Sequence, residues 1–249
     1  MKFESYGLLA FLLVLVGSTH VQGALVRTYE NCKVLRESTT ASTDYKLYWN
    51  IVGENIELAV EVTTVGWVGL GIATQPNMLS GGAGSDIMLG WVAEGECSDG
   101  CLFDYWVKER EGIAQPLILD EDLPENAGTQ SAMLFAALEV DGVTTLEWTR
   151  ALDTGETGAD RPINSDEPVW VIFASNLLAD PSDSRTFSIH STGTNAAMSI
   201  TFGEPSSCTS DGGDGETDDG ASTDGNDGDG DSDETESNAS IISSFIIIG

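Results

Sequence analysis

Four stretches of the chain alternate apolar and polar residues with a period close to two or are rich in β-branched and aromatic residues, and this pattern constrains the fold more than any other feature. The stretches are "YKLYWNIV" (45–52), "NIELAVEVTT" (55–64), "SAMLFAALEV" (131–140) and "TTLEWTRAL" (144–152). Successive side chains of a β-strand point to opposite faces, so a period close to two predicts short strands separated by turns. The short segments "VGEN" and "VDGV" between them are typical of hairpin turns.

Three further stretches are apolar almost throughout. They are "GWVGLGIAT" (66–74), "DIMLGWVA" (86–93) and "VWVIFAS" (169–175), and they are typical of strands covered on both faces. No long helix with capping residues is predicted between them. The sequence therefore predicts an all-β fold, a β-sandwich, with an up-and-down barrel as the alternative that stays open.

The two ends of the chain differ in composition from its middle. The start carries a lysine, a short apolar run and a flank of small residues, which is the anatomy of a secretory signal peptide; an uncleaved anchor is the alternative. After residue 208 the chain is rich in Gly, Asp and Ser, as in a disordered stalk, and it ends in a short apolar tail. We expect a signal peptide at 1–23, a folded domain at 24–208, a disordered acidic stalk at 209–237 and the tail at 238–249.

This organisation predicts a protein outside the cell, either secreted or held at the cell surface. The order of polar spacer and apolar tail resembles a signal for a glycolipid anchor, and the tail is too short for an ordinary membrane-spanning helix. Asn238 opens an Asn-Ala-Ser sequence, a site for N-glycosylation if the tail is retained.

The formal net charge of −31 excludes one class of partner. Twelve acidic residues between Asp211 and Glu236 face no lysine or arginine, and the predicted domain itself holds 28 acidic residues against 9 basic ones. Such a chain repels phosphate backbones and anionic membrane surfaces. We expect no nucleic-acid binding.

The chain has four cysteines, and a secreted protein with an even number is expected to pair them. Three connectivities are possible. We favour Cys97 with Cys101, inside "CSDGC", and Cys32 with Cys208, which would join the two ends of the domain. No cysteine then remains for catalysis or metal binding.

Five motifs in order resemble the DOMON domain family. They are "GWVGLGIA", "GSDIMLGWV", "WTRALDTGETGADRPI", "VIFA" and "FSIHSTGTNAAMSITF". The resemblance extends over roughly residues 43–203 and is strongest to the DOMON domain of dopamine β-hydroxylase-like monooxygenases, with a similarity also to haem-binding cytochrome DOMON domains. It implies an immunoglobulin-like β-sandwich that binds haem or sugars.

In haem-binding members of this family a Met and a His ligate the iron from opposite sides. His190 lies where the resemblance implies the histidine, but Gly82 and Ala83 stand where the methionine is usual, and Met78 lies further upstream. Met88 and Met198 are poorer candidates, because both fall within predicted strands. Imidazole and thioether are a reasonable axial pair, and without a Cys-x-x-Cys-His motif the haem would be non-covalent haem b. The first expectation is thus an extracellular haem-b electron-transfer module with a redox partner.

A redox-silent binding module for a sugar or an aromatic amine is the alternative. Trp67, Trp91 and Trp106 could offer flat apolar faces, and Asp86 could bind hydroxyl groups, with Asp104 or Asn77 as further polar candidates. Each tryptophan can equally be a core residue. A purely structural adhesion role is the third alternative.

The acidic segment "DTGETGAD" (153–160) offers Asp153, Glu156 and Asp160 as oxygen ligands for a hard cation. Its alternative interpretation is an Asp- and Gly-rich turn between strands.

Catalysis by this chain alone is not expected. Copper hydroxylation in the resembled monooxygenases resides in separate domains rich in histidine, whereas this chain has two histidines, His20 and His190. It also lacks the Gly-x-Ser-x-Gly motif of serine hydrolases. We therefore expect neither a copper site nor an enzyme.

Overall fold

A computed structural model of the chain describes residues 25–37, 44–79, 83–92, 100–107, 109–110, 113–114, 117–123, 128–156 and 158–208. The predicted signal peptide, acidic stalk and apolar tail with Asn238 lie outside these residues, as does Cys97.

One sheet has five antiparallel strands in the order β1-β2-β3-β11-β10. Its strands are β1 (Asn31–Arg36), β2 (Tyr45–Val52), β3 (Asn55–Val62), β10 (Met133–Val140) and β11 (Val143–Ala151). The four alternating stretches form β2, β3, β10 and β11, so the prediction of strands there is confirmed. The hairpin turn between β10 and β11 has positive φ at Asp141 (53°) and Gly142 (78°), as a tight two-residue turn requires.

The second sheet has six antiparallel strands in the order β13-β12-β4-β5-β6-β9. Its strands are β4 (Val68–Ala73), β5 (Ser85–Trp91), β6 (Cys101–Val107), β9 (Ile118–Leu119), β12 (Val169–Ser175) and β13 (Ala196–Ile200). Every residue of β4 and β5 is buried, as their apolar stretches predict. In β12 the buried positions alternate with half-buried ones, so full cover of both faces was a wrong expectation for this strand.

The remaining elements are small. Strands β7 (Glu109–Arg110) and β8 (Ile113–Ala114) pair with each other, and a 3₁₀ turn, η3 (Asp120–Asp122), follows β9. Within the described ranges, no helix has the length and apolar character needed to cross a membrane.

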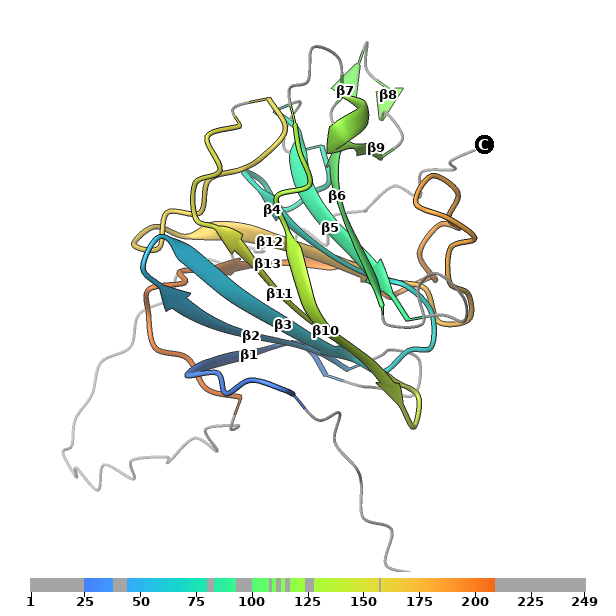
Figure 1. Ribbon diagram of the computed structural model, residues 1–249, viewed down its shortest axis with the longest axis horizontal. Coiled ribbons are helices and arrows are strands. Elements are labelled where there is room, and N and C mark those ends of the chain that lie inside the picture. The colour runs from blue at the N-terminus through green and yellow to red at the C-terminus, as the bar shows by residue number, and fades with distance from the viewer. Residues whose placement is uncertain are drawn as a thin grey trace, which may run out of the picture.

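The two sheets pack face to face, and β1, β2, β3, β10 and β11 lie in front of the other layer in Figure 1. The largest apolar cluster, which includes Leu47, Leu58, Leu70 and Phe173, contains residues of both sheets and fills the space between them. The Tyr45 hydroxyl donates to the Gly69 carbonyl across this space at 3.0 Å. The structure is thus the all-β sandwich and not the barrel.

A disulfide joins Cys32 in β1 to Cys208, with 5.0 Å between the Cα atoms. Beside it, the Ser206 carbonyl accepts a hydrogen bond from the Cys32 amide at 3.1 Å. The predicted pairing of these two cysteines is confirmed. Cys101 is also disulfide-bonded, and its predicted partner Cys97 lies outside the described residues.

Candidate functional site

A second apolar cluster lies on the face of the six-stranded sheet that points away from the sandwich core. In β5 the side chains of Ile87, Leu89 and Trp91 belong to it, while the intervening Met88 belongs to the core cluster. We call it the outer cluster. Its buried members are Trp67, Ile87, Leu89, Trp91, Tyr105, Val107 and Leu119.

The segment 184–191 lies over the outer cluster. Tyr105 donates from its hydroxyl to the Ser184 carbonyl at 2.8 Å, and Trp67 donates from Nε1 to the Ser188 carbonyl at 3.1 Å. Phe187 meets the Tyr105 ring edge-on, with 5.7 Å between centroids. These contacts hold the chain that carries His190 against the apolar face.

His190 is half-buried at the end of this segment. Its Nδ1 lies 3.2 Å from the Ser191 carbonyl, and the Ser191 amide donates to the Ser175 carbonyl at the end of β12 at 3.0 Å. If Nδ1 carries the proton and donates it to the Ser191 carbonyl, Nε2 is left to accept a hydrogen bond or to bind a metal.

Met78 lies in the loop after β4, and its side chain is 38% exposed. The neighbouring Leu79 packs against the outer cluster, and its carbonyl accepts from the Gly84 amide at 3.1 Å, just before β5. Ser175, next to the His190 segment, pairs with Val68 at the start of β4. The two loops are therefore anchored at opposite ends of β4, five residue steps or roughly 16 Å apart along the strand, so their anchor points do not bring Met78 to His190.

The other methionine candidates also lie away from His190. Met88 is 1% exposed in the core between the sheets, and Met198 packs against that same core from β13.

The residues predicted to line a ligand pocket are all buried. Trp67, Trp91 and Trp106 are 5%, 2% and 7% exposed, and Asp86 is fully buried. Trp67 and Trp91 belong to the outer cluster, whereas Trp106 lies below the guanidinium group of Arg161, 5.0 Å from it. They serve here as packing residues, which was the alternative interpretation for each tryptophan. Asn77, the further polar candidate, is exposed in the Met78 loop.

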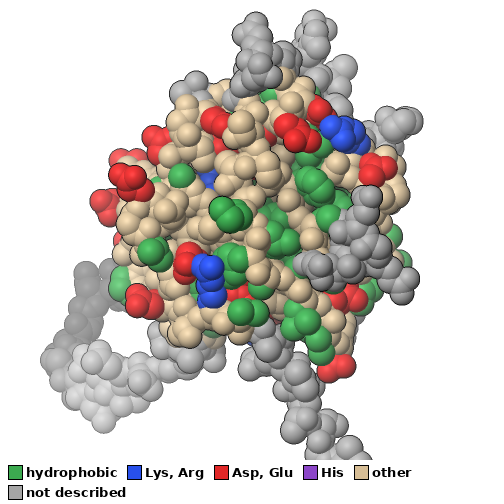
Figure 2. Space-filling model, viewed as in Figure 1, with side chains coloured by type: hydrophobic (Ala, Val, Ile, Leu, Met, Phe, Trp, Pro, Cys, Tyr) green, Lys and Arg blue, Asp and Glu red, His purple; other side chains and the backbone are tan. Residues whose placement is uncertain are grey.

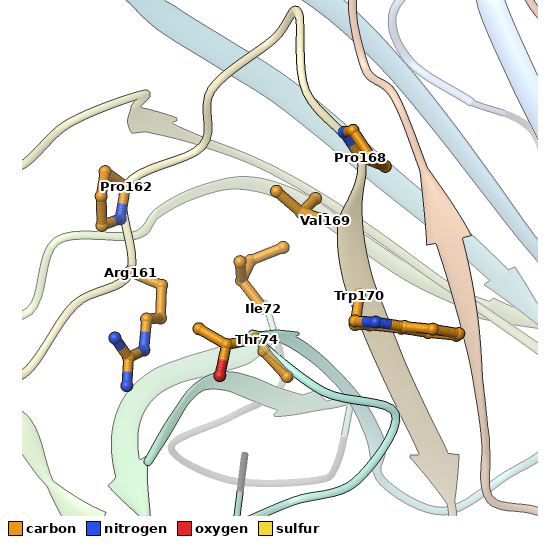
Figure 3. Close-up of a pocket in the computed structure, with 8 residues that line it drawn as sticks. Ile72, Thr74, Arg161, Pro162, Pro168, Val169 and Trp170 are labelled. Carbon is orange, nitrogen blue, oxygen red and sulfur yellow. The ribbon is translucent and has the colours of Figure 1, made fainter. Parts of the chain in front are cut away.

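A cavity of about 260 Å³ opens at a different place, beside the end of β4 and the start of β12. Figure 3 shows Arg161 and Pro162 on one side of it, Pro168, Val169 and Trp170 on the other, and Ile72 and Thr74 between them. The Arg161 guanidinium donates to the carbonyl groups of Ala83 and Gly84. The residue types of this wall carry no strong sequence signal, because Pro and Arg are common in loops.

Below this cavity the sandwich buries a set of carboxylates around one arginine. Arg150, in β11, donates to Asp86 in β5 and so connects the two sheets, and both side chains are fully buried. Asp160 lies 3.9 Å from the same guanidinium group. Asp104 in β6 and Asp120 in η3 are each 1% exposed.

Burial disfavours the charged forms of these acids. It raises the pKa of Asp104 well above its usual range, and the charges of Asp86 and Asp160 raise it further. Burial, followed by the charges of Asp104 and Asp160, raises the pKa of Asp120 to about 10. The sequence indicates Asp86, Asp104 and Asp160 as candidates for separate reasons but gives no sign of Asp120, because "LDED" has the composition of any polar turn.

The sequence profile of the DOMON domain matches residues 41–176. The match takes in most of both sheets, from β2 to β12. The chain belongs to the DOMON family. Because the match spans more than half of the chain, the predicted family is confirmed, while the fifth motif, which contains His190, lies beyond the matched residues.

Two curated DOMON relatives are distant and much longer. MOXD1 homolog 2 of Drosophila melanogaster is 28% identical over 123 residues, which are 49% of this chain and 14% of that protein. A cytochrome b561, DM13 and DOMON domain-containing protein of Arabidopsis thaliana is 25% identical over 171 residues, 61% of this chain and 18% of that protein. This chain therefore spans less than a fifth of either relative.

Among solved structures, the cytochrome b domain of pyranose dehydrogenase from Coprinopsis cinerea aligns with a TM-score of 0.41 at 12% identity, over 65% of this chain and 77% of that chain.

Proposed function

We propose that this DOMON domain is an extracellular electron-transfer module that binds haem b at its outer cluster through His190. The observation that carries the proposal is the place of His190: a half-buried imidazole in the segment that lies over the outer cluster, with Nδ1 beside a carbonyl group. The cytochrome named in the Arabidopsis relative supports the same choice.

The residues at this face fit one half of a haem site. Aromatic and aliphatic side chains suit the apolar macrocycle, and an imidazole with its second nitrogen hydrogen-bonded is the usual axial ligand. Bound haem b would supply a one-electron couple. The chain itself would hold the ring orientation of His190 through Ser191 and exclude water through Phe187 and Trp67.

Met78 is the proposed second ligand, and this assignment requires a movement. Its loop is anchored by Leu79 at the far end of β4, so the thioether must fold back over the outer cluster when haem binds. Met78 is 38% exposed and its neighbour Leu79 packs against the outer cluster, so we propose that this loop moves when haem binds.

The place of action is proposed to be outside the cell, either free or tethered by the apolar tail. The Cys32–Cys208 disulfide supports an oxidising compartment. The partner would be an extracellular redox protein or small electron donor, and neither catalysis nor nucleic-acid binding is proposed for the chain.

The deciding experiment is an absorption spectrum of the full chain, produced in an oxidising host supplied with haem, before and after dithionite. A Soret band with sharp reduced α and β bands is expected, and His190→Ala should lose it. Met78→Ala should change the reduced bands, whereas Met133→Ala, on the exposed face of β10, should not. A folded protein that stays colourless with added haem would overturn the proposal.

A sugar-binding role is the second candidate, and the cavity beside Arg161 favours it. Apolar walls with a hydroxyl and a guanidinium group are the usual composition of a small-ligand site. The arginine favours a neutral sugar over the cationic amine. Calorimetric titration with monosaccharides tests this, and Arg161→Gln should weaken binding while His190→Ala leaves it unchanged.

A further inference from the structure

Three carboxylates from two parts of the chain that are distant in sequence lie close together in the folded domain. Asp120 lies in η3, whereas Glu156 and Asp160 follow β11, and one oxygen of each lies within 4.8 Å of the other two. Oxygens that share a Ca²⁺ ion at about 2.4 Å each lie at most about twice that distance apart. The spacing thus matches a common cation.

Two of the three carboxylates, those of Asp120 and Asp160, lack hydrogen-bond donors of their own within the described part of the chain. Asp120 is 1% exposed and Asp160 is 3% exposed, and neither oxygen of either side chain has a hydrogen-bond donor among the described residues. A buried carboxylate without a donor is costly, so an unfilled demand for positive charge exists here.

The basic residues nearby do not meet that demand. Arg150 binds Asp86, and the Arg161 amide donates to Asp86 as well, at 3.1 Å. Asp160 has only the more distant contact of 3.9 Å to Arg150. Asp104 lies within 4.8 Å of Asp86 and Asp160, which adds to the negative potential.

Hydrogen bonds and close packing hold the backbone around the trio in place. The Asp160 amide donates to the Glu156 carbonyl at 3.0 Å, and the Glu156 carboxylate accepts from the amide and hydroxyl of Thr129 at 2.9 and 2.6 Å. A Cβ atom added at Gly128 would lie 2.8 Å from Asp120 Cβ, so the backbone at Gly128 packs directly against Asp120. Carboxylates on fixed backbone cost little entropy on binding a cation.

We propose that Asp120, Glu156 and Asp160 form a Ca²⁺ site. Only oxygen ligands are offered, which suits a hard cation, and their arrangement on two separate segments is irregular, which Ca²⁺ accepts more readily than Mg²⁺. Glu156 is half-buried and gives the ion a route from solvent. The ion would connect η3 to the segment after β11 and so brace the end of the sandwich. This site is independent of the haem proposal.

The test is thermal unfolding of the full chain with EDTA, with Ca²⁺ and with Mg²⁺, together with calorimetric titration. At a free Ca²⁺ concentration about a hundredfold above Kd, the Tm should rise by on the order of 5 to 10 °C over EDTA, and less with Mg²⁺. Asp160→Asn should bind Ca²⁺ at least tenfold more weakly and lose the rise in Tm.

Asp153→Asn is the matched control, because Asp153 belongs to the same acidic segment, is exposed and lies outside the trio. This variant still carries the acidic stalk, and Ca²⁺ should raise its Tm as much as that of the wild type. Asp120→Asn guards against a folding defect: in EDTA it should be about as stable as the wild type, since burial raises the pKa of Asp120 and a neutral amide then replaces a neutral carboxyl group, yet Ca²⁺ should not stabilise it. A wild type that Ca²⁺ does not stabilise, or an Asp160→Asn variant that it stabilises fully, would overturn the proposal.

Discussion

Single side chains in this domain titrate far from their usual range because they are buried near other acids. Asp180 shows this outside the candidate sites. It is half-buried, its Oδ1 has no donor among the described residues, and burial followed by the charge of Glu139 raises its pKa to about 6.

The sign of the pH effect follows from this raised pKa. An aspartate in the unfolded chain titrates near 3.9, so the charged form of Asp180 lowers stability above about pH 6, and this cost disappears as the pH falls below about 4. Asp180→Asn should therefore raise the Tm at pH 7.5 by about 2 °C, a small value because solvent screens a partly exposed group, and should leave the Tm unchanged at pH 4.

Thermal unfolding of both proteins between pH 4 and 8 checks this prediction. Glu139→Gln is the control, since it should lower the pKa of Asp180 without removing its carboxyl group. A Tm difference that persists at pH 4 would show that packing, and not charge, is responsible.

At the scale of elements, the connection from β4 to β5 depends on a glycine. Gly84 has φ of +86°, and a Cβ there would lie 2.5 Å from the Trp106 ring. Its carbonyl also accepts from Arg161 at 3.0 Å. This one residue therefore positions the start of β5 between an indole and a guanidinium group.

Gly84→Ala should lower the free energy of unfolding by about 2 to 4 kcal/mol, the sum of a left-handed backbone and an overpacked tryptophan. Gly142→Ala provides the comparison, because φ there is +78° but nothing lies within 4 Å of a Cβ; about 1 kcal/mol is expected. Urea denaturation measures both. Equal losses would mean that the contact with Trp106 is relieved at no cost.

Across the whole molecule, the acidic charge is spread over the surface while the ends of the domain are held together. Figure 2 shows acidic side chains scattered over one face with few basic ones among them. The Cys32–Cys208 disulfide spans a sequence separation of 176 residues, and Ser206 adds hydrogen bonds to Cys32 and Asn31 beside it.

Replacing both Cys32 and Cys208 by serine should lower the free energy of unfolding by about 3 to 5 kcal/mol, because so long a loop loses much entropy when it is closed in the unfolded chain. Urea denaturation measures the loss, and the wild type under reducing conditions should lose at least as much, because the disulfide of Cys101 is then broken as well. A loss below about 1 kcal/mol would indicate that the hydrogen bonds around Ser206 suffice to hold the ends.

The sequence by itself determined the two hairpins and seven strands, because apolar patterning and the residues of tight turns are local properties; these strands are β2, β3, β4, β5, β10, β11 and β12. It favoured the Cys32–Cys208 pair among three connectivities, and the structure confirmed that pair. Its five motifs also led to the DOMON family. Only the tertiary structure decided that Asp120 meets Asp160, that Trp67 and Trp91 cover one face of a sheet, and that Met78 and His190 are anchored at opposite ends of β4. These contacts depend on strand order and on which side of a strand faces inward, and residues far apart in the chain carry no local mark of either.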